Sequence, residues 1–296
     1  MIQLIIDGLF VGSFYALVAL GYSMVYGIIK LLNFAHGDVY MVGAFAGLTI
    51  FSAFSGLAGG GILSILLVML LAMIFTGILG VTIERVAYRP LRSSPRLAVL
   101  ITAVGMSFIL EYGVRQIFGP DPKVYPTRLE GETLDLLGGR ITMPQIVMML
   151  VAAALMFGLN TYIMRSRDGR AMRAIALDPT AAQLMGVNVN KVISRTFFIG
   201  SALAGAAGVM AGAYYGTIDF LAGFVIGLKA FTAAVIGGIG NLYGAMLGGL
   251  VLGLLEAFGT HWLGGEWRDV FSFACLILFL SFRPTGILGA RVVERM

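Results

Sequence analysis

Charged residues are scarce in this sequence. Only 12% of its 296 residues are Asp, Glu, Lys or Arg, whereas 59% are hydrophobic, and the mean hydropathy is +0.94. Soluble domains usually contain about a quarter charged residues. The composition therefore excludes an ordinary water-soluble fold and predicts an integral membrane protein that is surrounded by lipid.

Cysteine and histidine are almost absent. The single cysteine, Cys275, lies inside an apolar stretch, so no internal disulfide can form. The two histidines, His36 and His261, stand in no H-x-x-x-H arrangement, and no C-x-x-C is present. We therefore expect no metal site and no cofactor. The sequence also lacks a G-x-S-x-G motif and a polar cluster that would indicate an enzyme.

A phosphate-binding loop of the G-x-x-x-x-G-K-[ST] type is missing as well. The nearest string, at 223–229, has Leu228 where glycine must precede the lysine, and it lies within an apolar segment. The chain is therefore predicted not to hydrolyse ATP itself, and any ATP-driven process would need a separate ATPase.

Long apolar segments, in contrast, are abundant. Nine of them approach the ~20 residues that a helix needs to cross a bilayer, and the first has no basic leader or cleavage site, so we expect it to be a retained span. We predict one all-α domain over 1–296, a bundle of eight or nine transmembrane helices. The tight link 237–241 leaves open whether 223–238 and 241–261 are full spans or re-entrant. The segments are 8–29, 36–54, 62–84, 97–118, 143–164, 195–216, 223–238, 241–261 and 268–284.

Basic residues gather between particular apolar segments. They concentrate in the segments 84–96 and 165–195 and in the C-terminal tail. Because loops rich in Lys and Arg stay in the cytoplasm, the N-terminus is predicted outside and the C-terminus inside. Nine crossings give the same result. The net charge of +5 is explained by these loops and does not indicate nucleic-acid binding.

Glycine is frequent, and its spacing is informative. Many of the 41 glycines are four residues apart, such as Gly8 with Gly12 and Gly249 with Gly253. This spacing places them on one face of a helix, where the missing side chain lets a second helix approach closely. We expect tight helix packing along these faces.

The basic segment 165–195 contains a short helix signal. Asp178 precedes Pro179 and Thr180, as at a helix start, then Ala181 and Ala182 follow, and Gly186 is expected to end the helix. By itself such a helix is either a connector between two spans or a docking element for another protein.

The motifs in this and other segments resemble those of one transporter family. The run from Thr180 to Gly186 is similar to the EAA motif of ATP-binding-cassette importer permeases, with Thr180 in place of the usual glutamate. With three further strings, it resembles the branched-chain amino-acid permease family, in particular the LivH-type subunit, over nearly the whole chain. The strings are NFAHGD at 33–38, GLKAFTAAVIGGIG at 227–240 and RPTGILG at 283–289.

This resemblance implies a non-catalytic permease in a bacterial inner membrane. It implies a second, related LivM-type permease, two ABC ATPase subunits and a periplasmic solute-binding protein as partners. The cargo would be branched-chain or similar hydrophobic amino acids. Permeases for urea and short amides in the same family are the alternative, and an ATP-independent transporter or channel is a further one. The resemblance implies that the ATPase is contacted through Asp178, Thr180, Ala181, Ala182 and Gly186.

Polar residues inside the apolar segments are candidates for the translocation path, because they are costly in lipid. Lys229 binds a substrate carboxylate, pairs with Glu256 or reaches toward the outer membrane interface. Asn33 and His36 are further candidates for the path, although packing is the favoured explanation for His36, which could also contact a partner.

Two other polar residues have structural explanations at this stage. Asp38 is expected to cap the helix that follows it, near the cytoplasmic face. Glu111 and Arg115 stand four residues apart, so they are predicted to neutralise each other on one helix face.

Overall fold

The computed structural model describes residues 1–54, 61–92, 94–126, 133–136, 138–283 and 285–289. The middle of the predicted loop 119–142, Pro284 and the C-terminal tail lie outside the described residues, so the basic residues predicted there are not placed.

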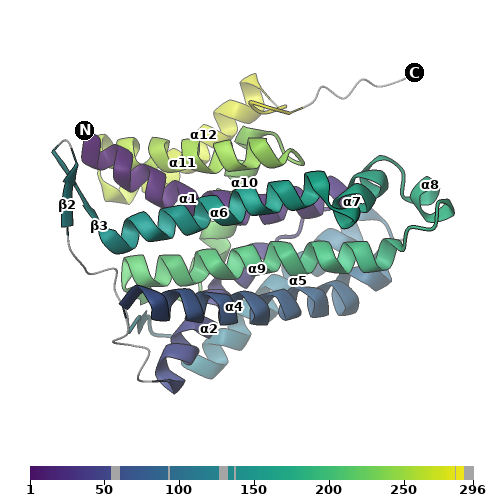
Figure 1. The fold of residues 1–296 in the computed structure, drawn as a ribbon, viewed down its shortest axis with the longest axis horizontal. Coiled ribbons are helices and arrows are strands. Elements are labelled where there is room, and N and C mark those ends of the chain that lie inside the picture. The colour runs from purple at the N-terminus through teal and green to yellow at the C-terminus, as the bar shows by residue number, and fades with distance from the viewer. Residues whose placement is uncertain (55–60, 93, 127–132, 137, 284, 290–296) are drawn as a thin grey trace.

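Nearly all of the described chain is helical, and the long helices run side by side (Figure 1). Each of the nine predicted apolar segments coincides with a helix. These are α1 (Ile2–Ile29), α2 (His36–Ala53), α4 (Gly61–Ile83), α5 (Arg96–Phe118), α6 (Met143–Arg165), α9 (Val189–Tyr215), α10 (Ala222–Gly237), α11 (Leu242–Leu263) and α12 (Arg268–Phe282).

Shorter elements lie at the two ends of the bundle. At one end, α4 continues into a π-helical turn (Glu84–Tyr88) and a 3-10 turn (Arg89–Leu91), and α7 (Arg167–Leu177) and α8 (Pro179–Leu184) follow α6. At the other end β1 (Lys123–Val124) pairs with β4 (Thr217–Ile218), and β2 (Thr133–Leu136) pairs with β3 (Gly139–Thr142), both antiparallel. The all-α prediction therefore holds for the bundle but missed these two small sheets.

Six helices of the described chain are long and apolar enough to cross a membrane: α1, α4 with its extension, α5, α6, α9 and α11. Three do not reach this standard. The first turn of α2 contains His36 and Asp38, α10 has only 16 residues and α12 only 15. The structure thus shows six candidate spans, fewer than the predicted eight or nine, because the remaining segments are short or polar at one end.

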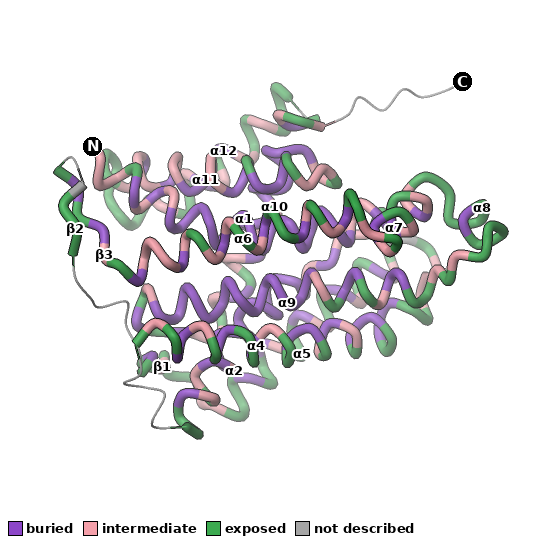
Figure 2. Tube along the Cα trace, viewed as in Figure 1, coloured by how far each residue is buried: buried purple, intermediate pink, exposed green. Residues whose placement is uncertain are grey.

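The helices differ in how deeply they are buried. In their most apolar windows, α1 is 78% buried and α9 89%, whereas α5 and α6 are only 33% and 28% buried. Figure 2 shows the same contrast, with buried residues continuous along α9 and exposed residues along α5 and α6. The centre of the bundle is therefore built on α1 and α9, while α5 and α6 present apolar side chains outward.

Glycines bring α1 and α11 into direct backbone contact. A Cβ atom added to Gly8 or Gly12 would lie only 2.9 Å from the Cα atom of Leu254 or Leu250 on α11. Gly253 faces the backbone of Gly12 from the other side. The predicted close approach of helices along glycine faces is confirmed, and it leaves no room for a side chain at these positions.

Candidate functional site

The short helix α8 forms where the sequence predicts it. The Asp178 carboxylate accepts hydrogen bonds from the backbone N–H groups of Thr180 and Ala181, at 2.8 and 3.0 Å. Gly186 ends the turn with a φ of +83°, a left-handed conformation that favours glycine. Ala182 is buried against the rest of the segment, whereas Thr180 and Ala181 are exposed. The predicted cap and end of the helix are confirmed.

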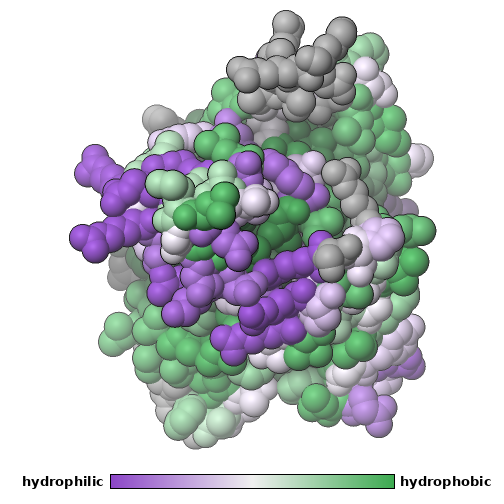
Figure 3. Space-filling view, turned by 90° about the vertical axis from the view of Figure 1, so that its right-hand side faces the viewer, coloured by the Kyte–Doolittle hydropathy of each residue, from purple (hydrophilic) through white to green (hydrophobic). Residues whose placement is uncertain are grey.

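Large apolar side chains project from this helix and its flanks. Leu177 is 90% exposed, and Leu184 and Met185 are each 84% exposed. They lie at the end of the bundle opposite the N-terminus (Figure 1). Figure 3 views this end and shows hydrophilic residues gathered around smaller hydrophobic areas. A six-residue helix is too short to bury several large apolar side chains, but their exposure was not predicted from the sequence.

Hydrogen bonds and an ion pair tie the segment 165–195 to the long helices. Asp168 at the start of α7 accepts a hydrogen bond from Tyr162 of α6 at 2.8 Å and forms an ion pair with Arg195 of α9. Because these contacts join α6, α7 and α9, they hold α7 in a defined position at this end of the bundle.

Glu84 makes a second connection at the same end. Its fully buried carboxylate forms an ion pair with Arg92 and accepts a 2.6 Å hydrogen bond from Ser194 of α9. Arg92 also donates to Asn190 at 2.7 Å. The end of α4 and the start of α9 are therefore linked. Glu84 was not predicted as a functional residue, although it lies at the end of an apolar segment and close in sequence to several arginines.

Four charged residues of α10, α11 and α12 form one cluster, in which Lys229 and Glu256 are buried and Arg268 and Asp269 are partly exposed. Lys229 places its Nζ atom 3.3 Å from Glu256 and 2.6 Å from Asp269. Arg268 forms a further ion pair with Glu256, and the Tyr15 hydroxyl donates to both Glu256 carboxylate oxygens at 3.0 Å. The alternative in which Lys229 pairs with Glu256 is therefore what the structure shows, and the pair is shared with two other charged residues.

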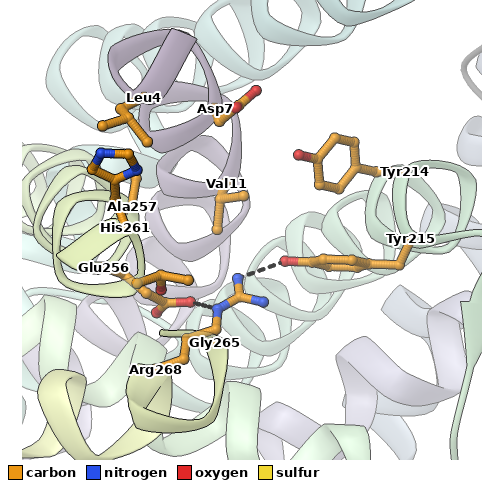
Figure 4. Close-up of a pocket in the computed structure, with 12 residues that line it drawn as sticks. Leu4, Asp7, Val11, Tyr214, Tyr215, Glu256, Ala257, His261, Gly265 and Arg268 are labelled. Carbon is orange, nitrogen blue, oxygen red and sulfur yellow. Dashed lines mark hydrogen bonds and ion pairs between the residues drawn. The ribbon is translucent and has the colours of Figure 1, made fainter. Parts of the chain in front are cut away.

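A pocket of about 480 Å³ opens beside this cluster, at the end of the bundle opposite α8. Its walls come from α1, α9 and α11 and from the segment that leads into α12. Figure 4 shows the Arg268 guanidinium between Glu256 and Tyr215, and its Nη2 atom lies 2.9 Å from the Tyr215 hydroxyl. The cluster thus ends in a partly exposed cation on the pocket wall.

Asn33 and His36 belong to a different buried group, between α1, α2 and the end of α4. Asn33 is 5% exposed and accepts a 2.6 Å hydrogen bond from Tyr88. His36 is 1% exposed, and its ring packs edge-on against Tyr22. The structure therefore does not bring these two residues into contact with Lys229 and Glu256.

Two predictions about buried carboxylates are wrong. Asp38 does not cap α2, since the N-cap is Ala35 without a side-chain bond, and its carboxylate accepts instead from Ser107 of α5. Among the ion pairs of the described residues, none joins Glu111 to Arg115. Glu111 is buried near Asp38, whereas Arg115 is exposed and lies over the Phe220 ring at 5.6 Å. The two side chains diverge because Glu111 hydrogen-bonds to Asp38 inside the bundle, whereas Arg115 makes a cation–π contact with Phe220.

Comparison with known proteins agrees with this architecture. Residues 4–280 match the model of the family described as branched-chain amino acid transport system / permease component. The chain belongs to this family.

Full-length relatives carry the same family description. The sequence is 49% identical to the high-affinity branched-chain amino acid transport system permease protein BraD of Pseudomonas aeruginosa, over 100% of this chain and 98% of the relative. It is 44% identical to the corresponding permease protein LivH of Escherichia coli K12, over 100% and 97%. This branched-chain amino acid permease is thus a non-catalytic, multi-pass membrane component of an ABC transporter, as the sequence motifs implied.

The features of this permease fall at opposite ends of its bundle. The short helix α8 and the contacts that link its segment to α4, α6 and α9 occupy one end, and the pocket with its charged cluster occupies the other.

Proposed function

We propose that this permease moves branched-chain or similarly hydrophobic amino acids across a bacterial inner membrane. It would act with a second, related permease subunit, two ABC ATPases and a periplasmic solute-binding protein. Relatives that match it over their full length are named for branched-chain amino acid transport, which favours this cargo over urea or short amides.

The proposed orientation places the N-terminus outside and α8 in the cytoplasm. Basic residues surround α8 and the end of α4, which supports a cytoplasmic location. Trp262 and Trp267 are 73% and 55% exposed near the opposite end, as expected for indoles at a membrane surface. In this orientation the chain would cross the membrane nine times, and α2, α10 and α12 would be the shorter crossings.

The observation that carries the proposal is the exposure of three large apolar side chains on α8 and its flanks, Leu177, Leu184 and Met185. Large apolar side chains at a water-facing, basic end of a membrane protein are unfavourable unless a partner covers them. We assign the ATPase subunit as that partner. Thr180 and Ala181 would contact it directly, while Asp178, Ala182 and Gly186 would hold the shape of α8.

We also propose that the translocation path passes the four buried polar residues Lys229, Glu256, Asn33 and His36. They are between 1% and 5% exposed, and buried polar groups in a membrane bundle usually mark a site of function. Lys229 with Glu256 and Asn33 with His36 would then line different parts of the path.

The test is a double variant in which Leu184 and Met185 are both replaced by glutamate. Burying each of these side chains contributes about 1.5–3 kcal/mol, so we expect ATPase association to weaken by at least about a hundredfold. Copurification of the ATPases with the permease from membranes measures this, and ATP-driven leucine uptake should be lost with it.

A matched control is Leu134→Glu, an exposed leucine in β2 at the opposite end of the bundle. It should leave ATPase association unchanged, and both variants should insert into the membrane. If the ATPases still copurify with the double variant, α8 is not their docking site. Uptake by the purified chain without ATPases would instead support the alternative of an ATP-independent transporter or channel.

A further inference from the structure

The pocket described above presents a cation with unused hydrogen-bonding capacity. A guanidinium group has five N–H donors. Arg268 directs its Nε atom to Glu256 and its Nη2 atom to Tyr215, and its Nη1 atom has no hydrogen-bond partner in the described part of the chain. Glu256 is shared with Lys229, so it does not fully neutralise Arg268. A carboxylate that enters the pocket can therefore still bind to this guanidinium.

An anionic group lies on the other side of the same pocket. Asp7 of α1 accepts a 2.9 Å hydrogen bond from Gln3, and in the described residues it has no ion-pair partner. Figure 4 shows Asp7 and Arg268 on opposite sides of the pocket, with Val11 between them. The pocket thus offers one unpaired carboxylate and one incompletely used cation at separate points.

The remaining wall between these charges is largely apolar. Leu4, Val11, Ala257 and the ring of Tyr214 line it. The volume of about 480 Å³ falls within the range of small-molecule sites, which are mostly apolar with a few placed polar groups. The pocket therefore suits a small ligand that carries two opposite charges and an apolar substituent.

We propose that this pocket binds a zwitterionic α-amino acid with an apolar side chain. Arg268 binds the carboxylate, Asp7 binds the ammonium group, and the wall of Leu4, Val11 and Ala257 contacts the side chain. This inference rests on the proposed function and adds to it a site at the outer end of the permease, where cargo released by the binding protein would first be held.

An acidic side chain of the binding protein is the competing occupant. Such a group would use Arg268 alone, and Asp7 and Glu256 beside it would repel a second negative charge. Only a ligand with an ammonium group uses both sides of the pocket, which is why the geometry favours the amino acid.

The experiment measures equilibrium binding of radiolabelled leucine to the complete transporter in nanodiscs, without the binding protein. We expect saturable binding. Leucinamide lacks the carboxylate and 4-methylpentanoate lacks the ammonium group, so each should compete at least about tenfold more weakly than unlabelled leucine. These two ligands test the two charged contacts separately.

Variants connect each contact to a residue. Asp7→Asn should weaken leucine binding about tenfold but should not weaken binding of 4-methylpentanoate, because that ligand has no ammonium group and is repelled by the Asp7 carboxylate. Arg268→Gln should abolish the preference for leucine over leucinamide. Asp121→Asn changes an exposed carboxylate outside the pocket and should bind leucine as the unmodified protein does.

Three results would overturn the proposal. The first is the absence of saturable leucine binding. The second is an equal affinity for leucine in the Asp7→Asn variant and in the unmodified protein. The third is loss of binding-protein association in Arg268→Gln without any leucine binding by the unmodified transporter, which would assign the pocket to the binding protein. In all three cases, leucine uptake by the unmodified transporter in proteoliposomes with the binding protein shows whether the proposed function itself still stands.

Discussion

Glu256 joins four helices through a single carboxylate. It lies on α11 and binds Tyr15 of α1, Lys229 of α10, and Arg268 and Ser272 of α12. Replacement of Glu256 by glutamine keeps the shape of the side chain but removes its charge. The substitution therefore tests how much the charge contributes to holding these helices together.

The magnitude follows from the partners that remain. Removing one member of a buried ion pair costs about 3–5 kcal/mol, because the other charge stays buried without compensation. Lys229 retains Asp269 at 2.6 Å, and Arg268 is 32% exposed, so we expect the lower end, ~3 kcal/mol. A change of 1 kcal/mol shifts the melting temperature by about 2–4 °C in chains of 150–250 residues. The expected decrease is therefore about 6–12 °C.

Scanning fluorimetry of the purified permease in detergent measures the shift, with the exposed Glu266→Gln as the matched control. Lys229→Met should cost less, because Glu256 keeps Arg268 and Tyr15 and because Asp269 is 53% exposed to solvent. The double variant of Glu256→Gln and Lys229→Met should be more stable than the sum of the two single effects predicts, by about 1–3 kcal/mol.

Two results would contradict this reasoning. An unchanged melting temperature in Glu256→Gln would show that the carboxylate contributes no net stability. Additivity of the two substitutions within about 0.5 kcal/mol would show that Lys229 and Glu256 do not act as a pair. If both substitutions left stability intact but abolished leucine uptake, the cluster would act in transport without holding the bundle together.

Two further predictions concern contacts elsewhere in the bundle. Gly12→Leu should separate α1 from α11, because a Cβ atom there would lie 2.9 Å from the Cα atom of Leu250. The yield of folded permease on size-exclusion chromatography should fall sharply. Gly113→Leu should have no such effect, because Gly113 has open space around it. Glu84→Gln should cost roughly 1–3 kcal/mol, because Arg92 is partly solvated, and should therefore lower the melting temperature by about 2–12 °C. It should reduce uptake while ATPase copurification persists; normal uptake would exclude a coupling role for this ion pair.

Several elements were predictable because their signals are local. Apolar segments of sufficient length indicated every long helix, and the cap at Asp178 together with Gly186 defined α8. The number of complete membrane crossings was harder to predict from the sequence. The length and polarity of α2, α10 and α12 depend on where each helix begins, and the boundaries of helices are poorly marked in a continuous apolar sequence.

The close packing of α1 against α11 was partly predictable. Glycines four residues apart indicate a helix face that another helix can approach, but they do not identify the partner. Only the structure pairs Gly12 with Leu250, more than two hundred residues further along the chain.

By itself, the sequence determined that this protein is a helical membrane permease without its own ATPase, and it located the helix α8. Composition, segment length and capping residues act within a few turns of chain, so they can be read without knowing the fold. Only the tertiary structure decided that Lys229 meets Asp269 as well as Glu256, that Glu111 turns away from Arg115, and that Asp7 and Arg268 face one pocket. These relations depend on the rotation and depth of each helix within the bundle, which are set by packing against distant parts of the chain.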